Sequence, residues 1–79
     1  NFAEKLRTIF RESITSIDSA QNIVVVKTMP GLASAACAAL DDMGVTYMVG
    51  SLAGDDTAFL VMRDTEAATD FCQEIKEML

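Results

Sequence analysis

The chain has 79 residues, of which 51% are hydrophobic, and six Lys and Arg against twelve Asp and Glu give it a formal charge of −6. It is long enough for one small domain and too apolar for a disordered segment, yet no apolar run is long enough to span a membrane. The absence of His removes the imidazole base, the Ser–His or Cys–His nucleophile pair and the His metal ligand. We therefore expect a folded domain that is not an enzyme.

Charge and cysteine content further narrow the class of protein to which this chain can belong. Residues 23–79 carry three basic against nine acidic side chains, so we do not expect this domain to contact nucleic acid directly. Cys37 and Cys72 lack the spacing of a zinc or redox pair and each falls in a helical apolar stripe, which predicts reduced, buried thiols in a cytoplasmic protein. The first residue is not Met and no secretory signal follows, so we expect further chain before Asn1.

The N-terminal third predicts a helix and two strands. Apolar residues at helical offsets indicate a short amphipathic linker helix in residues 1–12. The residues on its apolar side are Phe2, Leu6, Ile9 and Phe10. Residues 13–20 are rich in β-branched and small side chains and predict the first strand. The continuous run IVVVK at residues 23–27 is typical of a strand covered on both faces.

A helix rich in Ala follows. Pro30 suits the first turn of a helix because its ring presets φ and its missing N–H costs nothing there, so we expect a helix over residues 30–43. The expected buried stripe consists of Leu32, Ala36, Ala39, Leu40 and Met43. Gly44 is a natural stop for this helix.

Two further strands and a helix complete the chain. Residues 45–52 predict the third strand and residues 57–63 the fourth. The connection AGDD at residues 53–56 is typical of a tight hairpin turn. Asp64 and Thr65 offer an N-cap for a final helix that runs to the C-terminus.

This order of elements predicts an α+β domain over residues 13–79, built in two layers. A four-stranded, mostly antiparallel sheet in β-β-α-β-β-α order carries two main helices on one face and is preceded by the short linker helix. The second and fourth strands are apolar on both sides, so the face without helices would expose an apolar patch, and we expect it to mediate self-association. In the alternative arrangement, the linker helix folds back over that face within one chain.

Two pairs of acids are the candidate functional residues. Asp55 and Asp56 adjoin on the expected hairpin turn, where they either serve turn chemistry alone or form a cation site. Oxygen ligands favour Mg²⁺, Ca²⁺ or an organic cation, and a guanidinium makes a bidentate, charge-assisted pair with a carboxylate. Asp41 and Asp42 are either a second acidic group for such a ligand or an ordinary solvated helix end. Ser34, in the first helical turns, either meets a ligand or caps the backbone.

Two motifs resemble those of a known family. The stretch GSLAGDDT at residues 50–57, followed by the apolar strand AFLVM, resembles the G-T-I-A-G-D-D-T motif of bacterial arginine repressors. The stretch KTMPG at residues 27–31 resembles their T-x-P-G turn, and the likeness covers about residues 13–79. It implies the C-terminal effector-binding and oligomerisation domain of an arginine-responsive transcriptional repressor, with a winged-helix DNA-binding domain preceding Asn1.

The same resemblance implies an assembly, a ligand and a site. Three such domains form a trimer, two trimers stack into a hexamer, and L-arginine binds between the trimers as the co-repressor of arginine metabolism genes, with no other cofactor. Carried over by position, the arginine-binding residues would be Asp55, Asp56, Asp41, Ser51, Ala53 and Ser34. Ser34 stands where the family commonly has Gln, so its shorter side chain is expected to reduce arginine affinity or alter the response.

Two other functions stay open at this point. One is an arginine-insensitive assembly module of a repressor paralogue, which the departure at Ser34 keeps in view. The other, from a different class, is a small Mg²⁺-dependent enzyme with Asp55 and Asp56 as metal ligands, although the sequence offers no strong candidate for a base or nucleophile.

Overall fold

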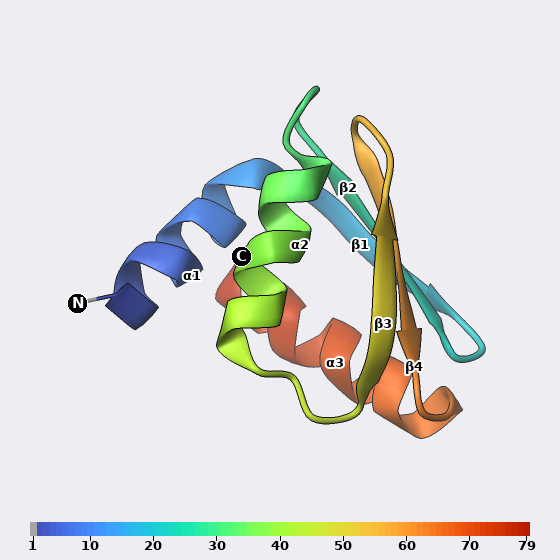
Figure 1. The fold of residues 1–79 in the computed structure, drawn as a ribbon. Coiled ribbons are helices and arrows are strands. Elements are labelled where there is room, and N and C mark those ends of the chain that lie inside the picture. Colours follow the sequence, from blue (N-terminus) through green and yellow to red (C-terminus); the bar gives the residue numbers. More distant parts are fainter. Residues whose placement is uncertain (1) are drawn as a thin grey trace.

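Within residues 2–79, the fold consists of three helices and one four-stranded sheet (Figure 1). The computed structural model describes residues 2–79, apart from the side chains of residues 2, 3 and 6. The elements are α1 (Phe2–Ser13), β1 (Ile14–Ala20), β2 (Ile23–Thr28), α2 (Ala33–Met43), β3 (Met48–Ala53), β4 (Thr57–Met62) and α3 (Thr65–Met78). The strands pair in the order β1-β2-β4-β3, and every pairing is antiparallel. The predicted α+β class and the order of elements are confirmed.

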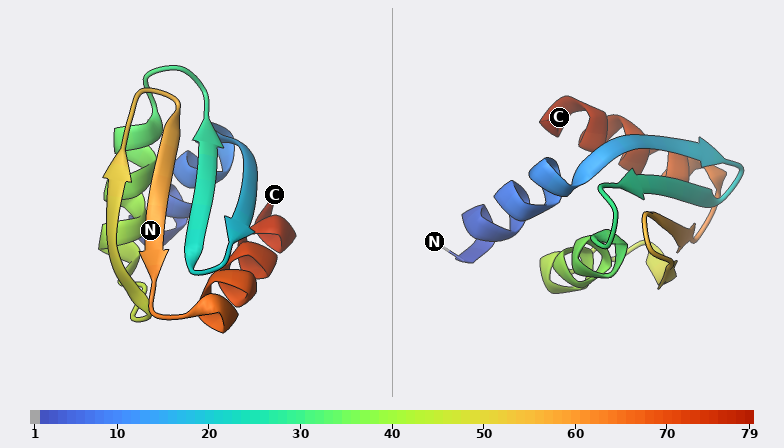
Figure 2. Two further views of the ribbon diagram at one scale, coloured as in Figure 1. Left: turned by 90° about the vertical axis from the view of Figure 1, so that its right-hand side faces the viewer. Right: turned by 90° about the horizontal axis from the view of Figure 1, so that it is seen from above.

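The core lies between the sheet and the helices. α2 and α3 cover one face of the sheet, and α1 packs against α2 on the same side (Figure 2). Because side chains alternate across a strand, every second residue of the two central strands points toward the helices, and Val24, Val26 and Leu60 are fully buried there. The helices contribute Phe10, Ala33, Ala36, Cys37, Leu40, Ala68, Phe71, Cys72 and Ile75 to the same cluster.

The N-terminal helix α1 lies where the sequence predicts a helix. Phe10 is fully buried and joins the core, whereas Ile9 is 47% exposed. Phe2 and Leu6, which were expected on the same apolar side, lie outside the described side chains. Since α1 packs against α2 through this end, the alternative in which the helix folds over the uncovered face of the sheet is wrong.

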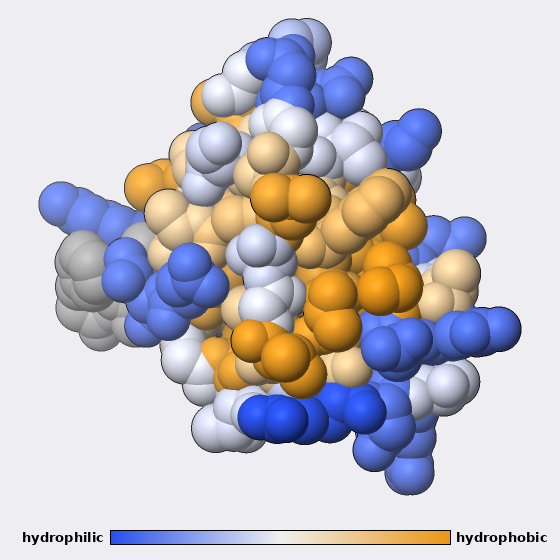
Figure 3. All heavy atoms as spheres, turned by 45° about the vertical axis from the view of Figure 1, so that its right-hand side comes forward, coloured by the Kyte–Doolittle hydropathy of each residue, from blue (hydrophilic) through white to orange (hydrophobic). Residues whose placement is uncertain are grey.

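The opposite face of the sheet is uncovered and apolar, as predicted. We call this surface, formed by Ile23, Val25, Val49, Leu52, Phe59 and Val61, the outer face. Leu52 pairs with Phe59 and Phe59 pairs with Val25, so these side chains run in one line across three strands. Leu52 is 75% exposed and Phe59 50% exposed. Figure 3 shows the broad hydrophobic surface that results.

The Ala-rich helix begins at Ala33, three residues later than Pro30, where it was predicted to begin. Gly31 has a φ of +80°, and the amide of Leu32 donates a hydrogen bond of 3.1 Å to the carbonyl of Met29. Residues 29–32 therefore form a turn with Pro30 second and Gly31 third, the arrangement of a type II turn. Leu32, predicted to be buried, precedes the helix and is 38% exposed.

The third strand also begins later than predicted, at Met48 instead of residue 45. Gly44 does end α2, with a φ of +68° and an amide that donates to the carbonyl of Asp41 at 3.2 Å. The chain then uses residues 45–47 to return from the helix to the sheet edge. Tyr47 precedes the strand, its carbonyl accepts a hydrogen bond of 2.9 Å from the amide of Arg63, and its ring packs edge-on against Phe71, with ring centroids 6.5 Å apart.

The final hairpin and helix agree closely with the prediction. β4 ends at Met62, and Asp64 is the N-cap of α3, since its carboxylate accepts a hydrogen bond of 2.7 Å from the amide of Ala67. Phe71 and Ile75 are buried on the sheet side of α3, whereas Leu79 is 51% exposed. The buried side of this helix therefore ends before the C-terminus.

Candidate functional site

The two adjacent acids lie at the tip of the β3–β4 hairpin, beside the turn that leads into α2 (Figure 1). Both side chains are exposed. The hairpin closes through a hydrogen bond of 2.8 Å from the amide of Gly54 to the carbonyl of Thr57. The Thr57 hydroxyl also donates to the Asp56 carboxylate at 3.1 Å, which orients that carboxylate relative to the strand. Asp55 and Asp56 thus offer two carboxylates to solvent from a closed turn.

The main chain of this tip is attached to a second segment of the protein. The amide of Ala33, at the start of α2, donates to the carbonyl of Asp55 at 3.2 Å. The amide of Thr28, at the end of β2, donates to the carbonyl of Asp56 at 2.7 Å. Hydrogen bonds therefore hold the main-chain carbonyl groups of both acids, while their side-chain carboxylates stay available to a ligand. Ser34 follows Ala33 and is exposed at the same end of α2.

A second group of predicted residues meets at the seam between α2 and β3. Ser51 and Asp41 both lie near enough to the Cys37 thiol to affect its pKa. Burial raises the pKa of the Cys37 thiol, Ser51 opposes this, and Asp41 adds to the increase. The sequence predicts only that Cys37 is buried in a helical apolar stripe. The structure adds that it connects two of the predicted site residues.

Helical periodicity places the predicted residues of α2 on one stripe. Ser34, Cys37 and Asp41 are separated by three and four residues, so they share one side of the helix. Contact between Cys37 and Ser51 orients this side toward the edge strand β3. Eight residues at about 1.5 Å each separate Ala33, beside the tip, from Asp41, a rise of about 12 Å. Within one chain, the tip acids and Asp41 therefore stand at two ends of a seam and do not converge.

Ala53 lies at the base of the tip. It is half-buried and packs against the core, and it lines a pocket of about 350 Å³. The residues that line this pocket are Leu52, Ala53, Gly54, Thr57 and Phe59. The lining is mostly apolar and includes neither of the tip acids. One chain alone therefore offers exposed acids and an adjoining apolar pocket.

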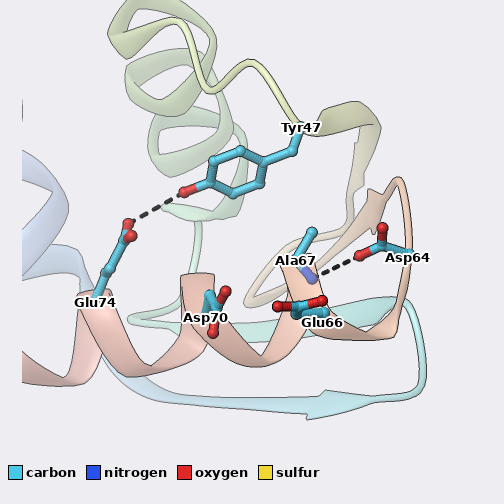
Figure 4. A pocket seen from close by; sticks show the side chains of 6 residues that line it. All are labelled: Tyr47, Asp64, Glu66, Ala67, Asp70 and Glu74. Atoms are coloured by element: carbon cyan, nitrogen blue, oxygen red, sulfur yellow. Dashed lines mark hydrogen bonds between the residues drawn. The ribbon is translucent and has the colours of Figure 1, made fainter.

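A separate acidic pocket, of about 250 Å³, lies where residue 47 meets α3 (Figure 4). The residues that line it are Tyr47, Asp64, Glu66, Ala67, Asp70 and Glu74. The Tyr47 hydroxyl donates to the Glu74 carboxylate at 3.1 Å. Burial is the largest of the causes that raise the pKa of the Tyr47 hydroxyl, and Glu74 and Asp70 raise it further. Sequence reasoning missed this contact because it placed Tyr47 in a strand, although the acids of α3 recur every four residues. The contact fastens the α2–β3 connection to α3.

Two further features concern metal ligands and membrane-spanning helices. Within residues 2–79, no group of three or more His, Cys, Asp or Glu side chains converges as a metal site. None of the helices within residues 2–79 combines the length and the apolar character that crossing a membrane requires.

Comparison with known proteins identifies the family. Residues 10–77 match the family described as "Arginine repressor, C-terminal domain". A protein of Acetivibrio thermocellus named "Arginine repressor" is 46% identical over 74 residues, which cover 94% of this chain and 48% of the relative. One of Caldicellulosiruptor bescii with the same name is 40% identical over 79 residues, which cover 100% of this chain and 52% of the relative.

This chain belongs to the family of arginine repressor C-terminal domains. It spans about half the length of the relatives named above. Those relatives are named as repressors, which are regulators and not enzymes. The resemblance seen in the GDDT and TMPG motifs is therefore confirmed at the level of the family.

Proposed function

We propose that this chain is the effector-binding and oligomerisation part of a cytoplasmic, arginine-responsive transcriptional regulator of arginine metabolism genes. Membership of residues 10–77 in the arginine repressor C-terminal family carries the proposal. L-Arginine is the effector, and operator DNA binds to a separate N-terminal domain, since this domain is acidic. Residues 13–79 form the effector domain, and residues 1–12 are the linker helix that leads to it.

Copies of the domain associate first as trimers, through the outer face. Leu52 and Phe59 are 75% and 50% exposed in the single chain. Burial of apolar surface stabilises a complex by roughly 25 cal/mol per Å² before the entropic cost of association. An exposed apolar surface spread over three strands of a small domain therefore favours self-association.

Arginine then binds between copies. Its guanidinium and ammonium are the groups that pair with carboxylates, and Asp55, Asp56 and Asp41 are the carboxylates on this edge of the molecule. Because the tip acids and Asp41 of one chain are separated along α2 by about 12 Å, we assign the acids around one arginine to different copies, at the interface between two trimers. Ser51, Ala53 and Ser34 lie along the same seam and complete the lining.

Charge links the ligand to the assembly. Each copy carries a formal charge of −6. Stacking two trimers brings acids of neighbouring tips together, and they repel each other unless a cation lies between them. Arginine therefore favours the hexamer, and by thermodynamic linkage the hexamer binds arginine more tightly than the trimer does.

Sedimentation and calorimetry with L-arginine test this function. We expect a hexamer with arginine and a smaller species without it, and weaker binding of ornithine and lysine, which lack the guanidinium fork. The Asp56→Ala variant should lose at least about tenfold in arginine affinity and stay in the smaller form, because a charge-assisted pair is lost. As the matched control, Asp70→Ala removes an exposed acid of α3 away from the tip and should behave as the unchanged protein.

Three outcomes would count against the proposal. A monomer with and without arginine would contradict the assembly. Normal arginine binding by Asp56→Ala would contradict the role of the tip acids. A hexamer that forms without arginine and binds none would instead identify the arginine-insensitive assembly module.

A further inference from the structure

Thr28, the last residue of β2, is a polar residue in a buried position, with 5% of its surface exposed. Its amide donates a hydrogen bond of 2.7 Å to the carbonyl of Asp56. Its hydroxyl donates a hydrogen bond of 2.8 Å to the carbonyl of Met29. Val would fill the same volume without a polar group to satisfy, so packing alone does not require a hydroxyl here.

The Met29 carbonyl is the start of the turn that leads into α2. It accepts a second hydrogen bond, of 3.1 Å, from the amide of Leu32, which closes the turn over Pro30 and Gly31. The next amide in the chain, that of Ala33, donates to the carbonyl of Asp55. The Thr28 hydroxyl therefore fixes one end of a turn whose other end holds the first tip acid.

Thr28 thus acts on both acids by two routes. Its amide holds Asp56 directly, and its hydroxyl holds Asp55 through the turn and the Ala33 amide. Both routes end on main-chain carbonyl groups, so they set the direction of the tip and leave the carboxylates free for a ligand. No part of Thr28 needs to touch that ligand.

We propose that Thr28 is a positioning residue of the arginine site, which orients Asp55 and Asp56 through the main chain of the hairpin tip. The inference rests on the proposed function for its ligand. A tip that is held before binding loses less conformational freedom when the ligand arrives, so affinity is higher for the same contacts. Loss of the hydroxyl alone should therefore weaken binding while the fold and the apolar core persist.

Three variants test the role of the hydroxyl by calorimetry with L-arginine. Thr28→Val removes the hydroxyl at nearly constant volume and should raise the Kd about five- to tenfold, the factor that corresponds to one hydrogen bond. Thr28→Ser retains the hydroxyl and should restore affinity to within about twofold of the unchanged protein. Thr69→Val is the matched control, because Thr69 also donates its hydroxyl to a carbonyl, that of Thr65 at 3.1 Å, but lies exposed on α3.

Amide hydrogen exchange without arginine separates this inference from the proposed function. In Thr28→Val, the Ala33 amide should exchange faster than in the unchanged protein, while amides in the middle of α3 stay protected. Equal affinity of Thr28→Val and the unchanged protein, or equal losses in Thr28→Val and Thr28→Ser, would overturn the positioning role. If the unchanged protein binds no arginine, the proposed function fails, and unaltered exchange at Ala33 would then overturn the positioning role by itself.

Discussion

Asp41 and Asp42 are identical neighbours at the end of α2, yet their surroundings differ. Asp41 faces the seam with β3, where its charge raises the pKa of the Cys37 thiol. Asp42 is rotated by about 100° around the helix, although both side chains are exposed. Apart from the family resemblance, the sequence could not show which of the two is the better candidate for the site. Helical spacing alone does not say which side of a helix faces an edge strand.

This difference gives a prediction for thiol reactivity. In a chain with Cys72→Ala, Asp41→Asn removes a negative charge beside Cys37 and lowers the pKa of its thiol. More thiolate is then present at pH 8, and alkylation by iodoacetamide should be faster by about twofold or more. The rate of alkylation in the native state is the measurement.

Asp42→Asn is the control and should leave the rate unchanged. Equal acceleration in both variants would contradict the placement of Asp41 against the thiol.

The two native thiols make the stability of the fold depend on pH at high pH. Burial raises the pKa of Cys37 and of Cys72 above the ordinary value of 9.0, so the unfolded chain loses these protons first as the pH rises. The free energy of unfolding should therefore fall as the pH increases beyond 9.0.

At the scale of elements, the turn between β2 and α2 is the clearest departure from the predicted fold. Pro30 fits the first turn of a helix and the second position of a type II turn equally well, since both need a φ near −65°. The choice depends on the next residue, Gly31, and on the amides of Thr28 and Ala33, which bind carbonyls of a distant hairpin. Those carbonyls belong to another part of the chain, so local propensity could not decide the boundary.

Gly31 offers a test of this turn. With a φ of +80°, Gly31→Ala should lower the free energy of unfolding by about 1 kcal/mol or more, because an Ala pays a steric cost in the left-handed region. Gly31→Asn should cost less, since Asn tolerates this conformation. Thermal or urea unfolding at fixed protein concentration measures the difference. A variant Gly31→Ala as stable as the unchanged protein would contradict the turn.

At the scale of the whole molecule, the main feature is the outer face, whose apolar side chains stay exposed to water in a single chain. Phe59 is central to it, paired with Leu52 on one side and Val25 on the other. Alternation along β2 and β4 predicted that both faces of the sheet would be apolar. The structure adds that α1 packs on the helical side, so the outer face remains open.

Substitution of Phe59 tests association through this face. Phe59 is 50% exposed in the single chain, so Phe59→Glu should leave the fold intact while placing a charge in the proposed interface. We expect the association constant in sedimentation to fall at least about tenfold, as for a central interface residue. Gln73→Glu adds the same charge on α3 and should associate normally. Association of Phe59→Glu at the level of the unchanged protein would show that copies meet elsewhere.

The sequence by itself determined the order of elements, the acidic hairpin tip, the two-sided apolar strands and the family. These depend on periodicity, on turn chemistry and on motifs that neighbouring residues carry together. Only the tertiary structure decided that α2 begins at Ala33, that Tyr47 packs on α3, and that Asp41 stands at the far end of a seam from the tip. The physical reason is the same in each case: hydrogen bonds and packing between segments distant in the chain outweigh local preferences that are nearly balanced.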